Sequence, residues 1–103
     1  VIYTALDPRL PASASRRVVW DIIRQIIGFK GFLLSDDVGM GALSVFGAPA
    51  RRVDAVLRAG CDAALHCDGD LAAMKDIAAR TQRMTEEGVR RYNLSISYFK
   101  GIT

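Results

Sequence analysis

Aliphatic side chains recur at steps of three and four residues in three parts of the chain. This spacing, at residues 18–27, from about 48 to 59 and at 71–78, is typical of helices with one buried face. Gly28 and Gly60 follow the first two stretches, at positions where a glycine commonly ends a helix. The pattern therefore predicts three amphipathic helices.

Polar residues that cap helices stand just ahead of two of these stretches. Ser13 or Ser15 is a suitable N-cap for the first helix, and Asp70 for the third. A further helix is expected to begin at residues 85–87, whereas the pattern at residues 95–99 is compatible with either a helix or a strand.

Three short apolar runs, at residues 1–5, 31–35 and 61–67, separate the helices and are predicted to be strands. The second run is almost wholly apolar, as in a parallel strand that is covered on both faces. The second and third runs start about 30 residues apart, the length of a β-α-β unit. This order predicts an α/β fold with parallel strands. Periodicity alone leaves open whether these strands form a doubly wound sheet or part of a barrel.

Composition and charge narrow the range of partners. Half of the 103 residues are hydrophobic and 24% are charged, as in an ordinary globular protein. The net charge of +3 comes from scattered basic residues, so we expect no nucleic-acid partner. No apolar run approaches the roughly 20 residues that span a membrane, so no membrane partner is expected. The chain opens at Val1 without a signal peptide or an initiating Met, which indicates either processing or a fragment.

Carboxylates follow each predicted strand, at the sheet edge where parallel α/β proteins carry their chemistry. Asp7 follows the first strand, Asp36 and Asp37 follow the second, and residues 66–70 follow the third. The adjacent pair is the most informative, because it comes directly after a buried strand. By spacing alone, a helix cap or a loop carboxylate is the commoner interpretation of such a pair.

Cys61, Cys67 and His66 suggest no chemistry of their own. If residues 61–67 are extended, the two thiols lie about 20 Å apart, which is too far for a disulfide. We therefore expect free, buried thiols in a reducing compartment. Two cysteines and one histidine do not form a zinc pattern, so a structural, hydrogen-bonded role is expected for His66.

Four segments, in order along the chain, resemble the barrel of family 3 glycoside hydrolases, and of bacterial β-N-acetylhexosaminidases in particular. Residues 27–40, I-G-F-K-G-F-L-L-S-D-D-V-G-M, are similar to the nucleophile segment of that family. Residues 1–8 resemble the strand and turn that precede it, and residues 11–15 resemble a helix start. Residues 59–67, A-G-C-D-A-A-L-H-C, resemble the last barrel strand.

The resemblance implies a retaining hydrolase that removes terminal β-linked N-acetylglucosamine, of the cytoplasmic type that recycles peptidoglycan. It assigns the nucleophile to Asp36 and leaves Asp37 as a neighbour. Met40 either contacts the substrate or packs under its loop. No metal and no organic cofactor are expected. Val38 and Gly39 replace the leucine and serine that are usual in the family.

The resemblance also implies a domain division. Residues 1–91 would be the last three strand-helix units of a (β/α)₈ barrel, and residues 92–103 an unassigned tail. The sequence lacks the earlier strands, which carry the family's sugar-binding segment and acid/base loop. A missing N-terminal barrel segment is therefore an expected partner. The chain alone is expected to be inactive. The alternatives are another family 3 glycosidase, such as a β-glucosidase, and a non-catalytic remnant that packs with a partner chain.

Overall fold

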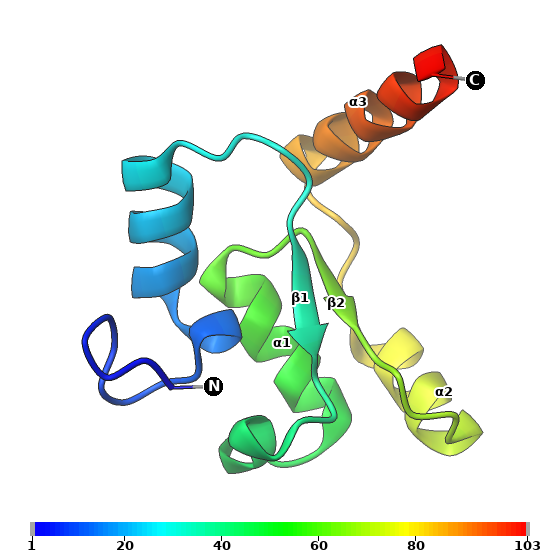
Figure 1. The fold of residues 1–103 in the computed structure, drawn as a ribbon. Helices are drawn as coiled ribbons and strands as arrows, with labels where there is room; N and C mark the ends of the chain where they lie inside the picture. The colour runs from blue at the N-terminus through cyan, green and yellow to red at the C-terminus, as the bar shows by residue number, and fades with distance from the viewer. Residues whose placement is uncertain (1, 103) are drawn as a thin grey trace.

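Two short parallel strands and a set of helices make up this α/β chain (Figure 1). The computed structural model describes the backbone of residues 2–102 and the side chains of residues 2–98. Two short 3-10 helices, a wider helix of the π type and three α-helices accompany the strands. The elements in chain order are η1 (Ala12–Ala14), η2 (Arg17–Ile27, π type), β1 (Leu34–Asp37), η3 (Gly41–Phe46), α1 (Pro49–Ala59), β2 (Ala63–Leu65), α2 (Leu71–Arg80) and α3 (Glu86–Ile102).

The parallel pairing of β1 with β2 confirms the predicted direction of these strands. Both strands are shorter than predicted, and β1 begins three residues later, so that the two aspartates lie in the strand. Leu34 pairs with Ala63 and Asp37 with Leu65, with an irregularity between these pairs. The ladder resumes after it, where the amide of Val38 donates to the carbonyl of Leu65 at 2.8 Å.

The strand predicted at residues 1–5 is wrong for the part of it that the structure describes. Residues 4–6 form a turn, in which the amides of Leu6 and Asp7 donate to the carbonyl of Tyr3 at 2.8 and 2.9 Å. A strand needs backbone partners on a neighbour, and residues 2–102 supply none to this segment. The backbone therefore satisfies its hydrogen bonds locally, and Tyr3 stays 55% exposed.

Helix α1 and the side chains around it form the core. It packs behind the strand pair in Figure 1. Its bounds confirm the prediction, with Pro49 in the first turn and Gly60 at φ +122° beyond the last. A side chain at position 60 would meet Val19 Cγ1 at 3.1 Å. The buried cluster consists of Ala14, Val19, Val38, Leu43, Val53, Val56, Ala59 and Cys61.

Helix η2 begins and ends where predicted, but only the first half of its predicted apolar face is buried. Ser15 Oγ accepts from the amide of Val18 at 3.1 Å, and Gly28 has φ +78°, as the sequence indicated. The later part of the apolar stripe is exposed, with Ile26 at 78%. Arg24 takes the inward position there, because its guanidinium is bound by a buried carboxylate.

Helices α2 and α3 cover little of the core. Asp70 Oδ1 accepts from the amide of Ala72 at 3.0 Å, which confirms this cap. The stripe predicted for α2 is mostly exposed, with Leu71 at 61%, and the part that packs on the core is Ile77. Helix α3 includes residues 95–98, which settles the open choice there in favour of a helix.

One face of the strand pair, turned toward the viewer in Figure 1, carries no helix among the described residues. Leu34 is 51% exposed and Leu65 38% exposed on these strands. The radius of gyration is 14.3 Å, against about 13 Å for a compact domain of this length. The chain is therefore slightly more extended than an average compact domain of this length. Within the described part, no helix is both long and apolar enough to cross a membrane.

Candidate active site

The two aspartates at the end of β1 differ in how they are held. Asp36 is exposed, and its Oδ1 accepts from the amide of Asp37 at 2.8 Å. No other hydrogen bond to the Asp36 carboxylate comes from residues 2–98. Asp36 lies at the carboxyl end of a parallel strand, where α/β enzymes carry their reacting groups. Its carboxylate is therefore open to a ligand at that end.

Asp37 is tied to the backbone on both sides. Its Oδ1 accepts from the amide of Gly39 at 3.0 Å and from the amide of Cys67, beyond β2, at 3.1 Å. These bonds stabilise the ionised form and hold the pKa of Asp37 below its usual value, the bond from Gly39 contributing most. Asp37 is thus a link between the loops that follow the two strands.

Ser35, on the other side of Asp36, is buried and bonded in two directions. Its Oγ donates to the carbonyl of Asp36 at 2.8 Å and accepts from the amide of Leu65 at 3.1 Å. In a regular ladder the amide of Leu65 would donate to a backbone carbonyl of β1, but here it donates to the Ser35 hydroxyl. This substitution of a side-chain acceptor explains the irregularity in the pairing.

Met40 is on the same loop as the aspartates. It is half-buried and precedes η3, and its amide donates to the carbonyl of Asp37 at 3.3 Å. The structure thus brings Met40 close to Asp37 through the backbone. Its possible contact with a substrate stays a prediction.

Asp7 does not belong to this site. No strand precedes it in the described residues, contrary to expectation, and its carboxylate caps a turn. Oδ2 accepts from Ser15 Oγ at 2.6 Å, and Oδ1 accepts from the amides of Arg9 and Leu10 at 2.9 and 3.2 Å. The bond from Ser15, followed by that from Arg9, lowers the pKa of Asp7. Asp7 therefore anchors the start of η2.

His66 and the cysteines differ in part from expectation. The imidazole of His66 makes no hydrogen bond to the described residues, so the hydrogen-bonded role is wrong within them. Both thiols are free, as predicted, but Cys67 is exposed because β2 ends at Leu65. Burial raises the pKa of Cys61 to about 11, so it stays a neutral thiol. Across the described chain, no three His, Cys, Asp or Glu side chains gather as metal ligands would.

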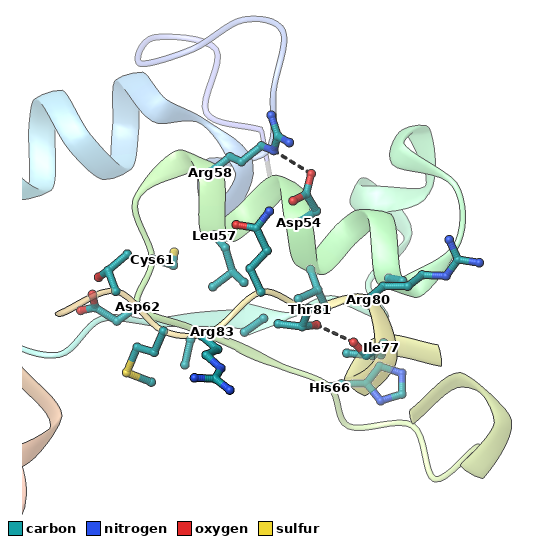
Figure 2. Close-up of a pocket in the computed structure, with 17 residues that line it drawn as sticks. Asp54, Leu57, Arg58, Cys61, Asp62, His66, Ile77, Arg80, Thr81 and Arg83 are labelled. Carbon is teal, nitrogen blue, oxygen red and sulfur yellow. Dashed lines mark hydrogen bonds and ion pairs between the residues drawn. The ribbon is translucent and has the colours of Figure 1, made fainter. Parts of the chain in front are cut away.

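A pocket of about 460 Å³ is separate from the aspartates. It lies between α1, β2, α2 and the segment after α2, and neither Asp36 nor Met40 lines it. Figure 2 shows Asp54 and Arg58 paired at its edge, at 2.8 Å. Arg80, also on its lining, is paired with Asp76 at 2.7 Å. The acidic groups of this lining, Asp54 and Asp62, are paired with arginines, whereas His66 and Arg83 on the same lining have no hydrogen-bond or ion-pair partner among the described residues.

A buried ionic network, which the sequence pattern did not indicate, lies at the opposite ends of the strands. Asp62, just before β2, is bound by Arg24 at 2.7 Å and by Arg91 of α3 at 2.9 Å. The carboxylate also accepts from the amide of Leu33 at 3.0 Å. One available signal was a charged residue inside the apolar run at residues 61–67. This network joins η2, both strands and α3.

A family model and several known proteins match most of this chain. A family model described as the glycosyl hydrolase family 3 N terminal domain matches residues 1–92. A protein named Beta-hexosaminidase from Pseudomonas aeruginosa (strain LESB58) is 39% identical over 98 residues, covering 85% of this chain and 29% of its own length.

Two further relatives carry the same name. That from Xanthomonas oryzae pv. oryzae (strain MAFF 311018) is 40% identical, covering 82% of this chain and 25% of its own length. That from Bordetella pertussis (strain Tohama I) is 46% identical, covering 70% of this chain and 20% of its own length. The chain thus spans less than a third of each of these relatives. The family match over residues 1–92, together with these identities, shows that the chain belongs to glycosyl hydrolase family 3.

Proposed function

We propose that this chain is the nucleophile-bearing part of a retaining β-N-acetylhexosaminidase, with Asp36 as the nucleophile. Residues 1–91 would form the last three strand-helix units of a (β/α)₈ barrel, with residues 92–103 as a tail. One observation carries the proposal: the Asp36 carboxylate is exposed at the carboxyl end of β1 while its neighbour Asp37 is bound to two backbone amides. The parallel β1–β2 pair and its uncovered face are consistent with a section of a barrel wall.

In a retaining glycosidase a carboxylate attacks the anomeric carbon as the glycosidic C–O bond breaks. A second group protonates the leaving oxygen and later takes a proton from the water that releases the sugar. Asp36 suits the first role, since it is open to a ligand and stands on a strand. Asp37 is engaged by the backbone and does not suit the second. The acid/base group is therefore proposed to come from a segment outside this chain, the missing N-terminal part of the barrel.

The proposed substrate is a glycan with a terminal β-linked N-acetylglucosamine. The shared name of the relatives favours a hexosaminidase over a β-glucosidase. Met40, on the loop after Asp36, is the proposed contact with the sugar. Cytoplasmic recycling of peptidoglycan fragments is the proposed setting, on the strength of the family resemblance.

The test places this chain in a complete barrel. The matching segment of the P. aeruginosa relative is replaced by this chain to give a chimeric barrel, which is assayed on a chromogenic N-acetylglucosaminide. Asp36→Asn should lower turnover by several orders of magnitude with little change in melting temperature, because it removes the anionic nucleophile at nearly constant size. Asp37→Asn, the matched control, should cost much less.

A 5-fluoro sugar identifies the nucleophile directly. The slow substrate should leave a covalent adduct on the peptide that contains Asp36. An adduct on Asp37, or wild-type turnover in Asp36→Asn, would show that the assignment is wrong. An unmutated chimeric barrel that folds but never hydrolyses the substrate would count against the function as a whole.

The chain by itself is expected to be inactive. General acid–base help contributes typically about 10²- to 10⁴-fold, and positioning of the substrate contributes more. The purified chain should therefore show no turnover above a buffer blank. Turnover that survives repurification would contradict this and would favour a complete site within these residues.

A further inference from the structure

Asp36 lies between two side chains that both bind the backbone of the β2 segment. Ser35 Oγ accepts from the amide of Leu65, and Asp37 Oδ1 accepts from the amide of Cys67, each across 30 residues of sequence. Both bonds use side-chain oxygens where a regular ladder uses backbone carbonyls. The segment that carries Asp36 is thus held to β2 immediately before and immediately after it.

The same two residues also bind Asp36 itself. Ser35 Oγ donates to the Asp36 carbonyl at 2.8 Å, and the amide of Asp37 donates to Asp36 Oδ1 at 2.8 Å. The first bond orients the peptide and the second orients the carboxylate. Asp36 Oδ2 receives no hydrogen bond from residues 2–98, so one oxygen is held and the other is open.

We propose that Ser35 and Asp37 are positioning residues, which bracket Asp36 and present its Oδ2 to the anomeric carbon. This inference rests on the proposed function, since it takes Asp36 as the nucleophile. A carboxylate on an irregular stretch of an exposed strand end would otherwise sample several orientations. Near-attack geometry requires reacting atoms about 3–3.5 Å apart, and a displacement of about 1 Å can cost 10²-fold in rate.

The geometry further assigns the role of Asp37 to its acceptor oxygen and not to its charge. Both of its backbone bonds, from Gly39 and Cys67, are accepted by the same atom, Oδ1. Asparagine has an equivalent oxygen at that position, whereas alanine has none. Asp37→Asn should therefore keep the hydrogen bonds from Gly39 and Cys67, and Asp37→Ala should remove them.

The variants are compared in the chimeric barrel. Asp37→Ala should lower kcat about 10- to 100-fold while KM changes less than about 3-fold, because the substrate still binds but meets a misplaced carboxylate. Asp37→Asn should stay within about 5-fold of the parent. Asp54→Ala, on the exposed face of α1, is the control and should not change kcat. If Asp37→Ala unfolds, Ser35→Ala carries the same test, because it removes the bond to Leu65 and should lower kcat about 10-fold.

A double variant separates positioning from any direct part in the reaction. In Asp36→Ala, added azide replaces the carboxylate: its C–N bond forms as the C–O bond to the aryl leaving group breaks, giving the inverted glycosyl azide. With no carboxylate left to position, adding Asp37→Ala should cause no further loss of this rescued rate. A further loss of 10-fold or more, or an Asp37→Asn variant as slow as Asp37→Ala, would overturn the proposal. Full activity in Asp36→Ala without azide would instead refute the proposed function.

Discussion

Removal of the Asp62 carboxylate should be among the most damaging single changes in this chain. The Asp62 and Arg24 side chains are 4% and 3% exposed, and their atoms approach to 2.7 Å. Arg91, 16% exposed, binds the other carboxylate oxygen at 2.9 Å. Asp62→Ala leaves the Arg24 charge buried without its counter-ion, because nothing else acidic is bonded to it among the described residues.

The expected loss follows from that geometry. Breaking one partner of a buried ion pair costs about 3–5 kcal/mol, and the lost bond from the amide of Leu33 adds about 1 kcal/mol. A typical domain is stable by only about 5–15 kcal/mol. By contrast, Asp54 pairs with Arg58 on an exposed helix face, the side chains being 54% and 77% exposed. Such a pair is worth about 0.3–0.5 kcal/mol.

Thermal melting of the chimeric barrel measures the difference. At about 2–4 °C per kcal/mol, Asp62→Ala should lower the melting temperature by roughly 8–24 °C and Asp54→Ala by no more than about 2 °C. Adding Arg24→Met to Asp62→Ala should restore part of the loss, because the orphan charge is then gone. Equal shifts for the two single variants, or no recovery in the double variant, would refute this account of the network.

Three further outcomes follow from other contacts. Gly60→Ala should lower the free energy of unfolding, measured by melting, by about 1–3 kcal/mol, because φ at position 60 is +122° and the new methyl group would meet a neighbouring helix. Gly41→Ala, which has open space around it, should lower it little. Folding lowers the pKa of Asp7, so its contribution to stability is complete above the unfolded pKa of about 3.9 and is lost as the pH falls through the folded pKa. Between pH 5 and 3 the melting temperature of the parent should therefore fall more than that of Asp7→Asn. Parallel plots of melting temperature against pH for the two proteins would contradict this. The isolated chain should self-associate through the face with Leu34 and Leu65, and a concentration-independent monomer in sedimentation would contradict this.

Helix ends were the part of the fold that the sequence predicted best. Gly60 ends α1 and Asp70 caps α2 as expected, because each depends on one residue and its neighbours within a few positions. The parallel direction of β1 and β2 was also predictable, since a strand, a helix and a strand of these lengths are compatible with few other connections. Asp36 was selected by its motif within a family segment, and spacing alone had favoured a cap or a loop.

Only the tertiary structure decided which groups meet across long separations. Arg24 and Asp62 lie 38 residues apart, so an arginine inside an aliphatic stripe gave no indication of its partner. The apolar run at residues 1–5 has strand composition, yet a strand forms only where another backbone supplies hydrogen bonds. The two aspartates are identical in type and adjacent in sequence. Their difference arises because the amide of Cys67, brought alongside by the β1–β2 pairing, binds one of them and leaves the other open.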